Sequence, residues 1–199
     1  DIFQYTSITY KLGRSSMATE LSSHQFTDVY ESLGVDLQGL GCIMLDVNEI
    51  DVSHIIDPED LYVSDKYAYV KGLVSNIVPH CTLLYGLMNK GSIIHNHVDR
   101  VLEGWSAAPV TIEKVGFFYS QVPDESWITI IAELVVSSNL MDAHTRLSML
   151  PHINTFPTYK PHITLAYVKQ SSDFKQYVDT INAELAGLVL DPVGINYGA

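Results

Sequence analysis

Two five-residue stretches carry the side chains best suited to chemistry. Pro79–Leu83 has the sequence PHCTL and Pro161–Leu165 has the sequence PHITL, so they differ only at the third position. The two histidines, His80 and His162, are 82 positions apart (162 − 80). If each stretch is a β-strand, alternate side chains point to opposite faces, so each copy places an imidazole and a hydroxyl on the same face. The repetition predicts one site built from two His/Thr pairs.

The residue between the His and the Thr of each pair is apolar. Strand alternation places Cys81 and Ile163 on the opposite face, where they would pack against a core. The same alternation puts Tyr85 and Tyr167, five residues after each histidine, on that apolar face. We therefore expect the histidines and threonines to line a site, and the tyrosines to lie on the side away from it.

Two imidazoles that face each other suit acid–base catalysis at a phosphodiester. Histidine has an unperturbed pKa of roughly 6.5, so near neutral pH one ring can accept a proton while the other donates one. The hydroxyls of Thr82 and Thr164 can donate to non-bridging phosphate oxygens, where charge builds in the transition state. This chemistry needs no metal ion. A single His-x-Thr on a strand is usually structural, and it is the second copy that favours a catalytic role.

The sequence around the two motifs predicts an α+β fold of two similar halves. Each motif strand is followed within a few residues by a helix, and each half contributes one His/Thr strand. We expect strands over 40–47, 80–86, 109–119, 127–136, 162–169 and 188–195, and helices over 92–103, 140–150 and 172–186. Residues 1–38 have no clear pattern and are interpreted as an N-terminal extension to a domain over 39–199.

Composition limits the possible partners. The chain has 199 residues, of which 47% are hydrophobic and 17% charged, so it can bury a sizeable core. Its net charge of −12 repels long polyanions, which argues against a non-specific nucleic-acid binder but not against a small phosphate ligand in a pocket. No apolar run reaches membrane-spanning length. The two cysteines, Cys42 and Cys81, form no disulfide framework, which favours a reducing, intracellular compartment.

The paired motifs resemble the signature of the 2H phosphoesterase superfamily, which includes LigT-like RNA cyclic phosphodiesterases. The resemblance covers roughly residues 40–199. It implies a bilobal fold with two antiparallel halves around a central cleft, chemistry without a metal or other cofactor, and a catalytic tetrad of His80, Thr82, His162 and Thr164. The first motif in its context, VPHCTLLYG preceded by YAYVKGLV, looks most like the viral anti-CBASS nucleases. That likeness implies cyclic di- or oligonucleotide substrates and action in the cytoplasm of the host cell, with no membrane partner.

A cyclic dinucleotide presents two bases as well as two phosphates, so aromatic side chains are expected to line its site. The candidates for substrate binding near the motifs are Tyr67, Trp105 and Tyr159, with Tyr69 and Phe156 as further aromatic candidates. Trp105 follows the apolar face of a predicted helix, which favours a place in the core. Glu133 shares a strand face with Thr129 and would either face solvent, read a base edge or orient a histidine.

The other six histidines have no spacing typical of a site. His95 and His97 lie two apart on a predicted helix and do not face each other, whereas a metal pair needs a spacing of three or four. Three alternatives to the cyclic-nucleotide hydrolase remain from the sequence. They are a 2′,3′-cyclic phosphodiesterase acting on RNA ends, a non-catalytic binding module that sequesters the nucleotide, and a virion component with a vestigial phosphoesterase lobe.

Overall fold

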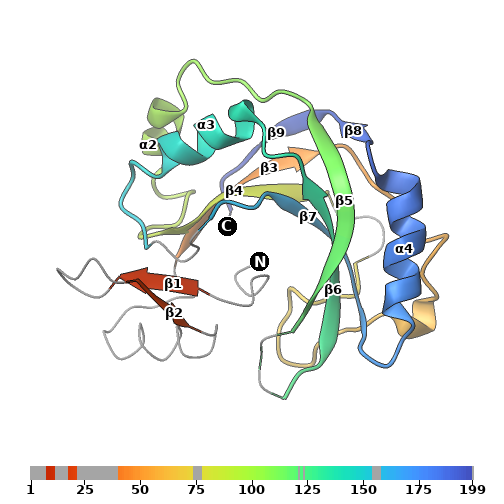
Figure 1. The fold of residues 1–199 in the computed structure, drawn as a ribbon. Helices are drawn as coiled ribbons and strands as arrows, with labels where there is room; N and C mark the ends of the chain where they lie inside the picture. The colour runs from red at the N-terminus through yellow and green to blue at the C-terminus, as the bar shows by residue number, and fades with distance from the viewer. Residues whose placement is uncertain are drawn as a thin grey trace.

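The computed structural model describes residues 8–11, 18–21, 40–73, 78–120, 122, 124–153 and 158–198. Its main feature is a seven-stranded sheet in the order β8-β5-β6-β7-β4-β3-β9, in which the neighbouring strands are antiparallel (Figure 1). The strands are β3 (Gly41–Val47), β4 (His80–Leu87), β5 (Val110–Tyr119), β6 (Trp127–Leu134), β7 (His162–Lys169), β8 (Val189–Leu190) and β9 (Pro192–Asn196). Both motifs begin strands, as expected, and these two strands are neighbours at the centre.

Among the described residues, three helices accompany the sheet: α2 (His95–Val101), α3 (Ser138–Leu147) and α4 (Phe174–Leu185). A short 3-10 helix, η2 (Pro58–Asp60), lies in the acidic loop. Residues before the main sheet include an antiparallel pair, β1 (Ile8–Lys11) and β2 (Ala18–Leu21). Most of the predicted N-terminal extension, 1–38, lies outside the described residues, and its boundary stays a prediction. In the described part of the chain, no helix has the length and apolar character needed to cross a membrane.

The predicted α+β fold class is confirmed, and several element boundaries shift. Helix α2 begins at His95 with Ile94 as its N-cap, later than the predicted start at residue 92. Helix α3 begins at Ser138, earlier than the predicted start at residue 140, and its N-cap is Ser137, whose side chain accepts a hydrogen bond from the Leu140 amide at 3.1 Å. A serine, asparagine or aspartate beside the true cap offers the same chemistry, so the choice depends on the path of the chain.

The predicted closing strand over 188–195 is two strands rather than one. Strand β8 pairs with β5 at one edge of the sheet and β9 pairs with β3 at the other, although only Asp191 separates them in sequence. The amide of Asn48, after β3, donates to the Asp191 carbonyl at 3.0 Å. The sheet is therefore so strongly curved that a single residue connects its two edges.

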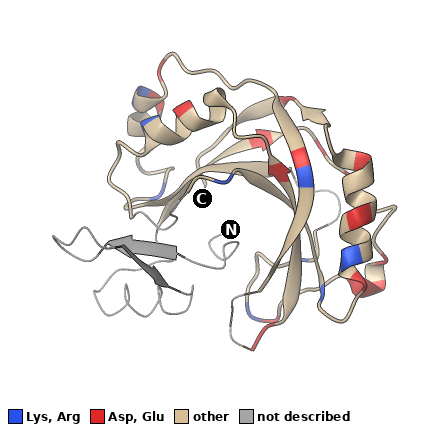
Figure 2. Cartoon of the chain, in the orientation of Figure 1, with Lys and Arg blue, Asp and Glu red and all other residues tan. Residues whose placement is uncertain are grey.

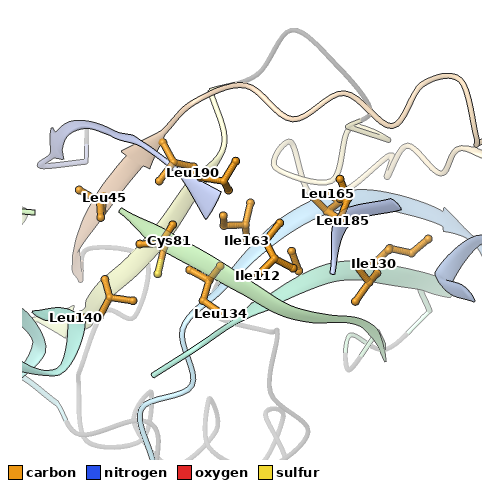
Figure 3. Packing of buried hydrophobic residues seen from close by; sticks show 14 of the residues in the cluster. Leu45, Cys81, Ile112, Ile130, Leu134, Leu140, Ile163, Leu165, Leu185 and Leu190 are labelled. Carbon is orange, nitrogen blue, oxygen red and sulfur yellow. The ribbon is translucent and has the colours of Figure 1, made fainter. Parts of the chain in front are cut away.

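The hydrophobic core lies on one face of this curved sheet. Cys81 and Ile163, the residues between each His and Thr, are fully buried in it. Figure 3 shows how side chains from several strands meet Leu140 of α3 and Leu185 of α4 there. Burying this apolar area supplies the main stabilisation of the fold, at roughly 25 cal/mol per Å². The helices thus cover the Cys81 face, and the His/Thr face is the other one.

Candidate active site

The tetrad is assembled by one contact between the two motif strands. Strands β4 and β7 are antiparallel, and Cys81 lies opposite Ile163. This register sets His80 opposite Thr164, and Thr82 opposite His162, one step to either side. Because alternate residues share a face, all four side chains project from the same patch, away from the core. The structure therefore brings together the four residues that the sequence predicts.

His162 is the more enclosed of the two histidines, with 8% of its surface exposed. Its Nδ1 lies 2.9 Å from the backbone carbonyl of Lys160; since a carbonyl only accepts, Nδ1 carries the proton and Nε2 keeps a lone pair. The ring of Phe118 packs edge-on against it at 5.8 Å between centroids. The pKa of His162 is lowered to about 4, mainly by burial and in smaller part by the nearby His80, while the hydrogen bond to the Lys160 carbonyl acts in the opposite direction. His162 is therefore neutral near pH 7.

His80 is half-buried, and burial lowers its pKa too. Two neighbours act in the opposite direction: Asp46, which lies opposite His80 on β3, and a hydrogen bond to the Val78 backbone. Val78 and Lys160 each lie two residues before their histidine. Each imidazole is therefore hydrogen-bonded to the backbone at the equivalent position of its motif. The local design of the two motifs is the same.

Each motif strand carries a bulge directly after its threonine. In β4 the pairing with β3 passes from Thr82 to Leu84, and in β7 the pairing with β6 passes from Thr164 to Ala166. An extra residue at a bulge reverses the side-chain alternation that follows it. The skipped residues, Leu83 and Leu165, are both buried with the core.

The bulges correct the expected position of two tyrosines. Tyr85 and Tyr167 were expected on the apolar face, but the reversed alternation places both on the His/Thr face. Tyr167 hydrogen-bonds the side chain of Thr164, which fixes it on that side. Tyr69 joins them, because it is close enough to Tyr85 and Tyr167 to interact electrostatically with both. The tetrad therefore has a tyrosine cluster beside it, which the sequence alternation alone misses.

Beyond the bulges, loop segments form backbone hydrogen bonds with the two motif strands where these no longer pair with each other. Beyond the bulge, the Tyr167 amide donates to the Gly72 carbonyl at 2.9 Å, and the Tyr62 amide donates to the Tyr167 carbonyl at 2.9 Å. On the other side, the Ile153 amide donates to the Gly86 carbonyl at 2.8 Å. A Cβ on Gly86 would lie 2.5 Å from the Ile153 carbonyl oxygen, so this position requires glycine. The two motif strands therefore diverge from their contact at Cys81 and Ile163.

Tyr159 was expected to bind substrate, and its contacts indicate a supporting role instead. Its hydroxyl donates to the Thr82 carbonyl at 2.9 Å and lies 3.9 Å from the Sγ of Cys81, on the core side of β4. Its ring stacks on His144 of α3 at 4.2 Å between centroids, and Nδ1 of His144 donates to the Leu83 carbonyl at 2.7 Å. Tyr159 and His144 therefore support the backbone of the first motif strand from the core face of the sheet.

Trp105 also lies away from the tetrad. Its Nε1 donates to the Asn139 carbonyl at 3.0 Å, and its ring packs against the core next to α3. The interpretation as a core residue therefore fits, and a role in stacking against substrate at the tetrad does not. Phe156, the other loop candidate, lies outside the described residues.

Tyr67 and Glu133 lie on the tetrad side of the sheet. The Tyr67 ring is 5.6 Å from that of Tyr69 and 6.4 Å from that of Trp127, whose own ring lies 6.2 Å from that of Tyr167. Glu133 lies directly opposite His162 on β6. The predicted binding roles of Tyr67 and Glu133 stay predictions. Alternation along β6, which also places Thr129 on this face, was sufficient to locate Glu133 but not its partner.

The comparisons with known proteins define the class. Residues 60–192, about two thirds of the chain, match the family model of the 2′-5′ RNA ligase superfamily. The chain belongs to this superfamily, the one expected from its paired motifs, whose members are phosphoesterases acting on phosphodiester bonds. The protein is thus a phosphoesterase, and the predicted 2H fold is confirmed. No curated protein matches the chain.

Proposed function

We propose that this phosphoesterase hydrolyses cyclic di- and oligonucleotides, such as 3′,3′-cyclic dinucleotides, without a metal ion. The observation that carries the proposal is the meeting of two imidazoles and two hydroxyls around one strand contact, in a member of a phosphodiesterase superfamily. The four residues are His80, Thr82, His162 and Thr164. They would act as the catalytic tetrad.

Cleavage of a phosphodiester needs two proton transfers, and the tetrad offers a group for each. One imidazole removes the proton from the attacking oxygen, either of water or of a neighbouring 2′-hydroxyl, and the other protonates the leaving oxygen. Each transfer is typically worth about 10²–10⁴-fold in rate. The two threonine hydroxyls donate to the non-bridging oxygens, which gain charge in the transition state.

Aromatic side chains beside the tetrad support a nucleotide as the substrate. Tyr69 is 38% exposed, stands beside Tyr67, and interacts with Tyr85 and Tyr167 from the motif strands. Stacking of a base on such a ring is worth about 1–3 kcal/mol. A substrate with a base next to the scissile phosphate would therefore gain affinity here that an inorganic or simple alkyl phosphodiester would not.

Charge supports a small substrate over a long one. The chain carries a net charge of −12, and Figure 2 shows the lysines and arginines of the described residues spread over several elements. A long polyanion would be repelled, whereas a small ligand interacts mainly with the groups at its site. We accordingly expect neither long nucleic acid nor a membrane as a partner. The proposed setting is the cytoplasm of an infected bacterium, where a virus would use this activity to counter CBASS immunity.

Two other activities make different predictions. The first is a 2′,3′-cyclic phosphodiesterase that acts on RNA ends, and its support is that the family description names RNA. A binding protein that sequesters cyclic nucleotides would need the aromatic cluster but not two proton-transfer groups.

The test is to incubate the full chain with 3′,3′-cyclic dinucleotides, with cyclic trinucleotides and with RNA ending in a 2′,3′-cyclic phosphate, each in the presence of a chelator. Chromatography should reveal linear products from the cyclic oligonucleotides, and the His80→Ala variant should produce none. Turnover of the RNA substrate alone would contradict the proposal. Recovery of unaltered cyclic nucleotide after heat denaturation of a complex would favour the binding protein, and activity lost in chelator would overturn metal independence.

A further inference from the structure

The two histidines have carboxylates at equivalent positions on the neighbouring strands. Asp46 on β3 lies opposite His80, and Glu133 on β6 lies opposite His162. Residues that lie directly opposite on one face have Cβ atoms about 4.5–5.5 Å apart. Each imidazole therefore has a carboxylate as a cross-strand neighbour.

The two carboxylates differ in their polar neighbours. Asp46 accepts a hydrogen bond from Nδ2 of Asn196 on β9 at 3.3 Å, and because that donor is neutral it orients the carboxylate without cancelling its charge. Glu133 has its Oε2 3.4 Å from the Nζ of Lys114 on β5, a positive charge that offsets part of its field. The field of a carboxylate thus reaches only one of the two imidazoles undiminished.

We propose that Asp46 is a positioning residue that favours the proton on His80 over His162, so that His80 acts as the general acid and His162 as the general base. This inference rests on the phosphodiesterase function proposed above and adds a division of roles to it. Among the described residues, the charged groups that pair with the two histidines across the sheet are Asp46 on β3, opposite His80, and Glu133 on β6, opposite His162. Lys114 on β5 lies beside Glu133, and the two imidazoles also act on each other.

Electrostatics supports this division. Asp46 raises the pKa of His80 and so opposes the lowering by burial, whereas burial takes the pKa of His162 to about 4. A bound phosphodiester carries one negative charge, which raises the pKa of both rings. Because the two rings repel each other when both are charged, only one readily gains a proton, and the ring beside the uncompensated carboxylate gains it first.

The proton balance of the reaction then closes. The Nε2 lone pair of His162 takes the proton from the attacking oxygen, and a new O–P bond forms while the bond between phosphorus and the leaving oxygen breaks. The leaving oxygen receives the proton of His80. The site ends with His162 protonated and His80 neutral, and exchange with solvent water restores the starting state.

The test compares Asp46→Asn with its matched control, Glu133→Gln, in the full chain. Imidazole titrations followed by NMR in the free protein give the pKa values of both histidines without any substrate. Asp46→Asn should lower the pKa of His80 by about one unit, the lower end of what an adjacent charge typically does, and Glu133→Gln should move that of His162 much less. Asp46→Glu keeps the charge and should restore most of the shift.

The rate profile provides the second readout, with a 3′,3′-cyclic dinucleotide as the probe. The alkaline limb of kcat/KM reports loss of the proton from the general acid, so Asp46→Asn should move it about one unit toward lower pH and reduce the rate above it about tenfold. An unchanged His80 titration, or an equal shift of His162 in Glu133→Gln, would overturn the proposal. If the probe is not cleaved by the native chain, the proposed function fails, while the titration still decides whether Asp46 holds the proton on His80.

Discussion

The two halves of the tetrad site share one backbone plan. In each half a motif strand has an outer strand beside it, β3 beside β4 and β6 beside β7, and a bulge falls at the same step after the threonine. The cross-strand partners also correspond between the halves. Between β3 and β4 they are Asp46 and His80, Met44 and Thr82, and Cys42 and Tyr85. Between β6 and β7 the equivalent partners are Glu133 and His162, Ile131 and Thr164, and Thr129 and Tyr167. The repeat in the sequence thus extends, in the structure, to strands that show no repeat in sequence.

The surroundings of the two halves differ where the chemistry requires a difference. Acid–base catalysis needs one imidazole protonated and one neutral at the same time, and two identical sites would not provide this. His162 is nearly enclosed beside the Phe118 ring, whereas His80 is half-buried beside Asp46. The backbone repeat therefore sets the geometry of the tetrad, and the neighbouring side chains distinguish its two histidines.

The largest expected effect is the loss of either histidine. His80→Ala and His162→Ala should each reduce kcat by about 10²–10⁴-fold, because each removes one proton transfer. The double variant should be little worse than either single one, since the two groups act as a unit. Single-turnover kinetics on a cyclic dinucleotide, with binding measured separately, checks this. Strong activity in either single variant would contradict the requirement for two proton transfers.

Stability against pH distinguishes the same two residues. The native pKa of His162 is about 4, below the ordinary value of 6.5, so the unfolded chain binds this proton first as the pH falls. The stabilising contribution of a neutral His162 is complete above pH 6.5 and is lost progressively toward pH 4, at most about 3 kcal/mol. Urea unfolding at pH 7.5 and pH 5 should show a smaller loss of stability in His162→Gln than in the native chain.

His80→Gln is the matched control for that measurement. The pKa of His80 is also lowered by burial, but Asp46 counteracts the shift, so this variant should differ less from the native chain over the same interval. Carboxylates also titrate near pH 5, and they do so in all three proteins, so the comparison among them isolates the histidines. An equal response of the two variants would contradict the asymmetry between the halves.

Strand alternation was enough to predict the tetrad from sequence, and the bulges mark where that reasoning ends. His80, Thr82 and their counterparts precede the bulges, so their shared face follows directly from a period of two. Tyr85 and Tyr167 follow the bulges and were placed on the wrong face. Nothing in the adjacent pairs Leu83-Leu84 and Leu165-Ala166 signals an extra residue, because both members of each pair are apolar and both are buried.

Other features could not be predicted because they depend on contacts between segments that are distant in the sequence. The division of 188–195 into two strands follows from the closure of the sheet, which no local pattern encodes. Tyr159 contacts the first motif strand, but the face of β4 on which it lies is decided by its stacking on His144 of α3, which is distant from it in sequence and adjacent in space. Asp46 lies on an outer strand with no motif of its own, and only the register with His80 reveals it.

The smallest effects should come from two tyrosine hydroxyls that support opposite halves. Tyr159→Phe removes the hydrogen bond to the Thr82 carbonyl behind the sheet, and Tyr167→Phe removes the one to the Thr164 side chain in front of it. A hydrogen bond of this kind contributes about 0.5–1.5 kcal/mol. In Tyr159→Phe the loss should appear mainly as a lower Tm, with KM unchanged, because the hydroxyl supports the backbone.

In Tyr167→Phe the loss should appear instead as a several-fold lower kcat, because a less well-held Thr164 hydroxyl donates less effectively to the phosphate. Thermal unfolding and steady-state kinetics on the same two variants separate these outcomes. A raised KM in Tyr159→Phe would return this residue to the substrate site. Equal kcat values for the native chain and Tyr167→Phe would mean that the second threonine needs no support from the tyrosine that its bulge brings to the same face.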